Sequence, residues 1–179
     1  MLFFLIALTG CGGLNLSEQD AQTLVKSSKS LPHDYPVIIR NSSDNEAILN
    51  LLQQNGLITW KFKWGNDYNG HSFDCDIYPT DKGKGFFLGK SQQQGELGIM
   101  FENYMFKGYT MDFNQIVGIS VNKENQTATV RYSQKATQVS PFAQLLANNT
   151  KFISQPLTSD ITEDVIFKKF DTGWQLATN

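Results

Sequence analysis

The chain has 179 residues, of which 40% are hydrophobic and 18% are charged, and this composition excludes a disordered or fibrous protein. Its 15 Lys and Arg nearly balance its 17 Asp and Glu, and the resulting formal net charge of −2 does not favour a polyanion as a partner. At about 100 to 200 residues per domain, this length predicts a single domain. The aromatic share of 12% and the 14 glycines favour a fold rich in strands.

An apolar run, Met1–Leu8, opens the chain. It is much shorter than the roughly 20 apolar residues that cross a bilayer, and it has the length of the apolar core of a signal peptide. The residues at its end, Leu8-Thr9-Gly10-Cys11, resemble the lipobox of bacterial lipoproteins: an aliphatic residue, two small residues and a cysteine. That resemblance implies cleavage before Cys11, a diacylglyceryl group on its thiol, and acylation of the new amino terminus by a fatty acid such as palmitate.

Two further observations bear on the lipoprotein hypothesis. Signal peptides normally open with Lys or Arg, and none occurs before Lys26, which leaves open a start upstream of Met1. Gly12 follows the cysteine where an aspartate would retain such proteins on the inner membrane, so the resemblance implies the periplasmic face of the outer membrane in a bacterium with two membranes. The alternative explanation is a buried N-terminal strand that happens to contain a cysteine.

The lipoprotein hypothesis divides the chain into a signal peptide at 1–10, a tether at 11–16 and a single domain at 17–179. Once Cys11 is acylated, Cys75 is the one cysteine that remains, so the core must stabilise the fold without a disulfide. We predict no cofactor. We predict two partners, namely the membrane, through the N-terminal lipid, and a protein of the envelope.

Capping residues and apolar spacing predict three helices. Ser17 caps the first, which continues to about Ser28. Ser42 or Ser43 caps the second, and Asn55-Gly56 ends it because glycine suits the left-handed conformation after a helix. The apolar face of this second helix consists of Ile48, Leu51 and Leu52. A short third helix begins at Ser140-Pro141, with the serine as cap and the proline in the first turn.

After Gly56 the apolar period changes from 3.6 to 2, which predicts strands. Two alternating runs, 58–64 and 72–77, pair as an antiparallel hairpin in one register. This register sets apolar residues against one another on one face and Lys against Asp on the other. The predicted pairs are Trp60–Ile77, Phe62–Cys75 and Trp64–Phe73 on the apolar face, and Lys61–Asp76 and Lys63–Asp74 on the charged face.

Two more hairpins are predicted towards the C-terminus. In the first, the apolar positions of Val117–Val121 face those of Ala128–Tyr132 across a turn at Lys123–Gln126. The other covers 164–177, with Asp171-Thr172-Gly173 as a three-residue loop whose glycine suits a bulge.

The remaining elements complete the predicted fold class. Tyr35–Arg40 forms a short strand or an extended lead into the second helix. Within 86–113 the apolar runs have uncertain boundaries because glycines interrupt them, at Gly89, Gly95, Gly98 and Gly108. The sequence therefore predicts an α+β domain with short N-terminal helices and an antiparallel sheet built from hairpins.

Catalytic candidates are few, since the chain has 2 histidines, His33 and His71. The most compact combination is a thiol nucleophile at Cys75 with His71 and Asp74. Strand alternation argues against it, because Cys75 shares a face with apolar residues while Asp74 points the other way. We therefore predict a buried apolar role for Cys75 and no catalytic residue.

Paired carboxylates and glycines offer two other candidate sites. Asp74 and Asp76 share a strand face and could hold a cation or transfer protons, but cross-strand pairs with Lys61 and Lys63 are the simpler explanation. We predict no metal site, because no spacing of His or Cys typical of metal ligands occurs. Asp81–Gly85 lacks the Lys-Ser/Thr end of a phosphate-binding loop, so we predict a turn between strands.

A second resemblance covers Glu46–Phe87. The helix ILNLLQQNGLI, a hairpin and the step IYPTDKGKGFF are similar to the last helix and wing of some winged-helix repressors, which implies nucleic-acid binding. The helix of this chain carries Asp44, Glu46 and amides but no Lys or Arg, which phosphate contacts need. We therefore predict no nucleic-acid partner.

Three functions are consistent with these observations. The first is a non-enzymatic envelope lipoprotein that acts as a binding module, and a variant of it is an immunity or inhibitor protein. The alternative is a periplasmic enzyme whose site is assembled from residues distant in sequence. An aromatic cluster bears on the choice, as either the core of central strands or an exposed binding patch. It consists of Phe101, Tyr104, Phe106, Tyr109 and Phe113.

Overall fold

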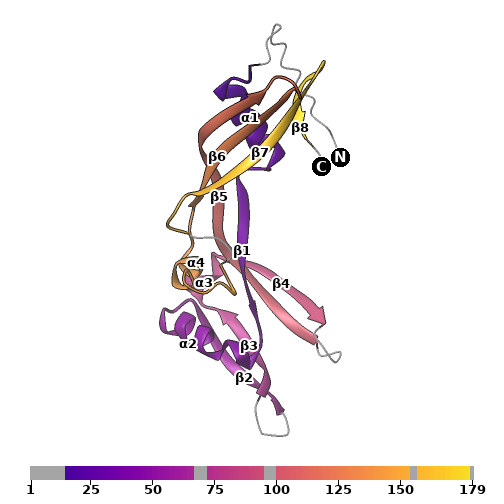
Figure 1. Ribbon diagram of the computed structural model, residues 1–179. Helices are drawn as coiled ribbons and strands as arrows, with labels where there is room; N and C mark the ends of the chain where they lie inside the picture. The colour runs from indigo at the N-terminus through magenta and orange to yellow at the C-terminus, as the bar shows by residue number, and fades with distance from the viewer. Residues whose placement is uncertain (1–14, 67–71, 95–99, 154–156, 178–179) are drawn as a thin grey trace. The chain divides into compact units, whose positions relative to one another are not determined.

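The computed structural model describes residues 15–66, 72–94, 100–153 and 157–177 (Figure 1). Strands alternate with short helices along the chain. In chain order the elements are α1 (Glu18–Ser28), β1 (His33–Arg40), the 3-10 helix η1 (Ser43–Asn45), α2 (Glu46–Gln54), β2 (Ile58–Asn66), β3 (Ser72–Pro79), α3 (Asp81–Lys84), β4 (Phe87–Gln94), β5 (Met100–Asn122), β6 (Thr127–Thr137), α4 (Pro141–Leu145), β7 (Ile161–Phe170) and β8 (Gly173–Leu176). Among these described helices, none has the length and apolar character that crossing a membrane requires.

Strands dominate the structure, and this corrects the predicted α+β class. The longest described helix, α1, has 11 residues, whereas β5 alone has 23. One sheet has the strand order β1-β5-β6-β7-β8, with β4 also paired to β5, and a second sheet consists of β2 and β3. The pairing is mostly antiparallel, so the fold is closer to all-β than to α+β.

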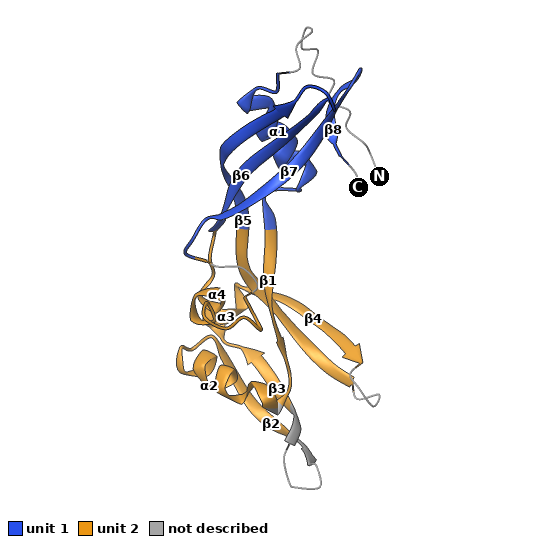
Figure 2. Cartoon of the chain, viewed as in Figure 1, with its two compact units in different colours: residues 1–33, 111–136, 158–179 blue, residues 34–110, 137–157 orange. Residues whose placement is uncertain are grey.

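The chain divides into two compact units (Figure 2). Unit 1 consists of residues 1–33, 111–136 and 158–179, and unit 2 consists of residues 34–110 and 137–157. Strand β5 contributes residues to both units. A single domain over 17–179 therefore stays a prediction.

In unit 1, α1 packs against one face of the sheet. The Ser17 hydroxyl accepts a hydrogen bond of 3.1 Å from the Asp20 N–H, which confirms the predicted cap. Leu16, which the sequence prediction placed at the end of the tether, is 6% exposed in the same core. The buried residues of this core are Leu16, Ala21, Val25, Ala128, Val130, Tyr132, Val165 and Phe167.

In unit 2, the helices α2 and α4 pack against each other, and α2 also packs against β2. The rings of Phe106 and Phe142 stack with their centroids 4.1 Å apart and join β5 to α4. Ser140 caps α4 as predicted, because its hydroxyl accepts a hydrogen bond of 3.2 Å from the Ala143 N–H. Large buried side chains of this unit are Ile39, Leu49, Leu52, Leu57, Ile58, Ile77, Tyr104, Phe106 and Phe142.

The second predicted helix is confirmed at its end and corrected at its start. Gly56 follows the cap residue Asn55 with a φ of +69°, as the sequence predicts. At the start, η1 precedes α2, so Asn45 takes the cap position in place of Ser42 or Ser43. The apolar face is also turned from the predicted one: its buried residues are Leu49 and Leu52, while Ile48 and Leu51 are half-buried.

The predicted register of the β2–β3 hairpin is confirmed up to Lys63, including the Trp60–Ile77 and Phe62–Cys75 pairs. Beyond Lys63 the register shifts, and Asn66 pairs with Ser72. The predicted Trp64–Phe73 pair lies inside this irregular segment. The alternating sequence does not reveal this shift. A bulge adds one unpaired residue to one strand, and nothing in the apolar and polar pattern of the two runs marks its position.

The two later hairpins also differ in detail from the prediction. Between β5 and β6 the turn is Lys123–Gln126 as predicted. Val117, however, is 52% exposed, because the residues of β5 that face the core include Ile116 and Ile119, which are three positions apart and not two. Between β7 and β8, Gly173 pairs with Phe170 and has a φ of +119°, so the loop has two residues and not three.

Two further segments, 35–40 and 81–85, were predicted as a strand or extended lead and as a turn. His33–Arg40 forms the strand β1, which settles the choice between a strand and an extended lead. The predicted turn at Asp81–Gly85 is instead the one-turn helix α3, since the Thr80 hydroxyl caps it by accepting from the Gly83 N–H at 3.2 Å.

Candidate functional site

The predicted lipid attachment site, Cys11, lies outside the described residues, as does His71. The attachment therefore stays a prediction. His33 stands at the start of β1, where it is exposed.

Cys75 lies in β3 with its side chain buried and 0% exposed. Its cross-strand partner is Phe62, and Ile77, two residues further along the strand, is also buried. The structure thus places the thiol in the apolar core of unit 2, as the alternation predicts. A buried thiol is inaccessible to a substrate, since nucleophilic cysteines occupy exposed or partly exposed sites.

The carboxylate of Asp76 forms an ion pair with Lys63, with 3.6 Å between the nearest atoms. The register places Asp76 opposite Lys61, so this contact is diagonal across the two strands. Lys61 instead lies over the ring of Tyr78, 5.8 Å from its centroid. The predicted Lys61–Asp76 strand pairing is therefore confirmed, but the ion pair of Asp76 is with Lys63 and not with Lys61.

The aromatic cluster of β5 forms core and does not form an exposed patch. Tyr104, Phe106 and Tyr109 are 1%, 0% and 3% exposed. Phe101 and Phe113 are half-buried. Tyr109 also stacks on Tyr35 with the ring centroids 5.2 Å apart. The first of the two predicted alternatives, the core of central strands, is confirmed.

A hydrogen-bonded cluster of titratable groups consists of Lys90, Glu102 and Tyr104, on neighbouring strands β4 and β5. The Lys90 ammonium donates to the Tyr104 hydroxyl at 2.9 Å and to the Glu102 carboxylate at 3.2 Å. The Tyr104 hydroxyl donates to that carboxylate at 3.0 Å and accepts from the Ile77 N–H at 3.4 Å. The cluster therefore joins the β4–β5 hairpin to β3.

Each group of this cluster has a pKa displaced away from neutral pH. Burial raises the pKa of the Tyr104 hydroxyl. The hydrogen bond with Tyr104 raises the pKa of Lys90, and the hydrogen bond from Lys90 lowers the pKa of the Glu102 carboxyl. A general acid or base works best with a pKa near the working pH, so this arrangement suits a fixed ion pair and not proton transfer.

We expect the Glu102→Gln substitution to change stability in a pH-dependent way, because it removes the ion pair with Lys90. Near pH 7 the substitution should lower the free energy of unfolding by less than about 1 kcal/mol, since water screens exposed pairs and the Glu102 side chain is 37% exposed. The pKa of this carboxyl is lower in the folded protein, so its contribution is present above the unfolded pKa and is lost as the pH falls through the folded pKa. The free energies of unfolding of the two proteins, measured in urea, should therefore converge as the pH falls below the lowered pKa of the folded carboxyl. A difference that stays constant would contradict this assignment.

Unit 1 presents a different kind of surface on the sheet face opposite α1. Along β7, buried Val165 and Phe167 alternate with exposed residues. The register pairs these exposed residues with the outward residues of β6. We call this surface the outer face, and its residues are Thr127, Thr129, Arg131, Asp164, Ile166, Lys168 and Phe170.

The outer face combines apolar side chains with a fixed charge pair. Ile166 is 47% exposed and Phe170 is 45% exposed. The Arg131 guanidinium donates two hydrogen bonds to the Asp164 carboxylate, at 2.8 and 2.9 Å, so the planar groups hold each other in place. Strand β7 is paired with β6 over Ile161–Lys168 and with β8 over Phe167–Phe170. The backbone of the outer face is therefore ordered by hydrogen bonds to β6, and this lowers the entropy cost of binding.

Sequence reasoning missed both the polar cluster and the outer face. For the outer face, the signal was the alternation of 162–170 together with Arg131 opposite Asp164, which only the β6–β7 register reveals. For the polar cluster, the signal was Lys90 opposite Tyr104 across β4 and β5.

In the part of the chain that the structure describes, no group of three or more His, Cys, Asp or Glu residues is placed to hold a metal ion. Comparisons with protein-family models, with curated proteins and with solved structures found no match to this chain.

Proposed function

We propose that this protein is a lipid-anchored lipoprotein of the bacterial envelope that binds another protein and catalyses no reaction. The anchor is the lipid on Cys11, and the binding surface is the outer face of unit 1. In a bacterium with two membranes, the domain stands on the periplasmic side of the outer membrane.

The lipobox resemblance at Leu8-Thr9-Gly10-Cys11 supports the anchor. Two or more acyl chains hold a protein stably on a membrane, because each buried methylene contributes about 0.8 kcal/mol. The packed part of the chain begins close behind, since Leu16 is buried in the core of unit 1. A short tether to a folded unit is the arrangement that a surface-anchored binding module needs.

The observation that carries the binding proposal is Ile166, which is 47% exposed at the middle of a regular sheet. Arg131, next to Asp164 on the same face, adds a side chain type that is enriched at protein interfaces. An exposed apolar side chain beside a fixed arginine resembles the centre of a protein interface more than a substrate cleft.

The outer face predicts that Ile166→Asp weakens the complex with the envelope partner. We expect at least about a tenfold loss of affinity, since a buried carboxylate without a partner is costly at an interface. The partner is isolated with the wild-type protein from envelope extract, and its affinity for each variant is then measured with purified components. Thermal unfolding of each variant establishes that the fold is retained.

Leu88→Asp is the matched control, because Leu88 is 52% exposed on β4 in unit 2 and is not a residue of the outer face. It should leave the affinity unchanged. Equal losses for Leu88→Asp and Ile166→Asp, or no loss for either, would rule out the outer face as the binding surface.

A further inference from the structure

The distance from the lipid to unit 1 is bounded by the number of residues between them. Cys11 is five residues before Leu16, and five residues of extended chain span no more than about 18 Å. Leu16 is fixed, because its side chain lies in the core of unit 1. Whatever path the tether takes, the anchored end of unit 1 stays close to the headgroups, whose layer is several ångströms thick on each side of the bilayer.

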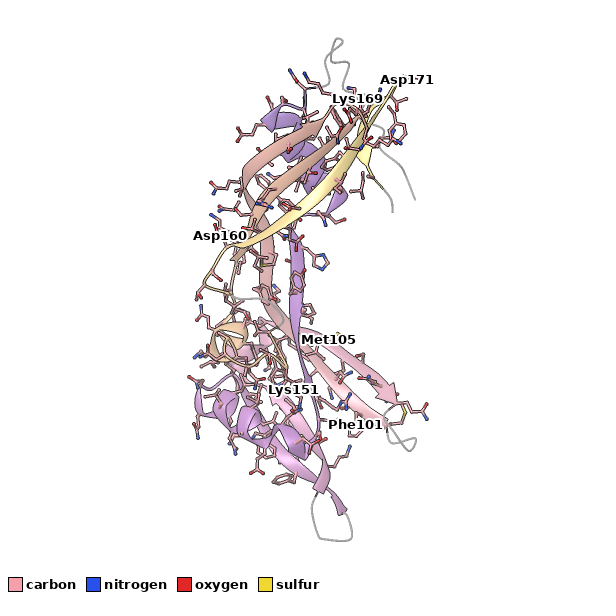
Figure 3. The ribbon with its side chains drawn as sticks, viewed as in Figure 1. Phe101, Met105, Lys151, Asp160, Lys169 and Asp171 are labelled. Carbon is pink, nitrogen blue, oxygen red and sulfur yellow. The ribbon has the colours of Figure 1, made fainter. Side chains whose placement is uncertain are left out.

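The direction of α1 identifies which end of unit 1 this is. Near the C-terminal end of α1, Lys29 forms an ion pair with Glu163 at 3.7 Å, close to the start of β7. The first turn of α1 therefore lies towards the other end of β7, at the same end of unit 1 as the β7–β8 turn (Figure 1). Figure 3 shows the direction of β7, with Asp160 close to its start and Lys169 and Asp171 at its other end.

This end of unit 1 carries two pairs of lysine and aromatic side chains, one on each face of the sheet. Phe170 is 45% exposed, and the Lys168 ammonium lies 5.8 Å from its ring centroid. Trp174 is half-buried against the core, and the Lys169 ammonium lies 5.6 Å from its ring centroid. We call these four residues the lysine–aromatic end. Aromatic rings at headgroup level, with lysines that extend their amines to water, are the pattern of membrane–water interfaces.

The charges at this end do not by themselves attract the protein to an anionic membrane. Lys168 and Lys169 are joined by Lys123 in the β5–β6 turn. Acidic residues of the same turns and of the first turn of α1 oppose them: Glu18, Asp20, Glu124 and Asp171. Contact with lipid therefore depends on the tether, which keeps the local concentration of headgroups high, and on burial of the aromatic rings.

We infer that the lysine–aromatic end of unit 1 rests in the headgroup layer of the membrane that holds the lipid anchor. This inference depends on the proposed anchor at Cys11. It adds an orientation, in which β7 meets the membrane with its C-terminal end and the middle of the outer face remains accessible to a protein partner.

Two matched cysteine variants test the orientation in the full-length lipidated protein. Thr172→Cys places a label in the β7–β8 turn, and Thr162→Cys places the same label at the opposite end of β7; both threonines are exposed. The label is the fluorophore NBD, and the proteins are reconstituted into phosphatidylcholine vesicles that carry a nitroxide quencher on the headgroup. We expect about twofold lower emission at position 172 and little change at position 162, because the quencher acts only within the headgroup layer.

The intact mass of the same samples separates this inference from the proposed anchor. If the mass includes the lipid and positions 172 and 162 are quenched equally, the orientation is wrong while the anchor stands. If the mass includes no lipid, the anchor fails, and the orientation fails with it. Phe170→Ser should also reduce the quenching at position 172, because the exposed ring is removed from the contact; unchanged quenching in that variant would overturn the role of the ring.

Discussion

The Cys11→Ser variant is expected to leave the membrane fraction and collect in the soluble fraction. A serine at this position cannot form the thioether that carries the diacylglyceryl group, so the acyl chains of the anchor are lost together. At about 0.8 kcal/mol per buried methylene, this removes essentially all of the membrane affinity of the anchor. Separation of membranes by centrifugation, followed by immunodetection of the protein in both fractions, measures the effect.

Cys75→Ala is the control for this experiment. Cys75 is buried in β3, so its replacement changes the packing of unit 2 but leaves the lipid attached. We expect this variant to remain with the membrane. If Cys11→Ser also remains there after a wash with high salt, although its mass shows that residues 1–10 have been removed, a lipid on Cys11 is not what holds the protein.

The Gly108→Ala substitution is expected to destabilise the fold strongly. A β-carbon at Gly108 would overlap the backbone carbonyl oxygen of Tyr35 and would crowd Val37 N at 3.1 Å, so β1 and β5 would have to move apart. Both contacts are backbone atoms, which cannot rotate away as a side chain end can. We expect a loss of about 3 kcal/mol or more in the free energy of unfolding, or failure to fold. Urea unfolding followed by circular dichroism measures it.

Gly118→Ala provides the comparison within the same strand. No atom lies within 4 Å of a β-carbon built on Gly118. An alanine there loses less backbone entropy on folding, so we expect stability to stay within about 1 kcal/mol of the wild type. A similar large loss at both positions would mean that any side chain is harmful in β5, and would contradict the explanation by close approach of β1.

Gly108 also explains why the middle of the chain was hard to predict. It interrupts the apolar pattern of 86–113, yet β5 runs through it, from Met100 to Asn122. Glycine in a sequence suggests a turn, but here Gly108 allows another strand to approach closely. The contact with β1, which is distant in sequence, determines the role of Gly108. The spacing of apolar residues around Gly108 does not reveal that contact.

Local signals were sufficient where a single residue determines the structure. Ser17 and Ser140 cap their helices as predicted, since a cap needs only a side-chain oxygen three residues before an N–H. The β2–β3 register was also predictable, because apolar and charged residues both favour one alignment, as in Trp60–Ile77 and Lys61–Asp76. The fold class was not, because the predicted helices are short and the strands of 86–113 had no visible boundaries.

The candidate surface required the structure for a related reason. Arg131 and Asp164 are distant in sequence, and their pairing depends on the β6–β7 register. Burial of Val165 and Phe167 against α1 decides that Ile166 faces outward. The sequence predicts that these strands alternate, but which face α1 covers is determined only when the elements pack together.

If a lipid on Cys11 holds this protein on the membrane, the intact mass of the protein extracted from membranes must include that lipid. We predict a chain that begins at Cys11 and carries a diacylglyceryl group and an amide-linked acyl chain. A chain extracted from the same membranes that retains Met1 and carries no lipid would contradict the claim.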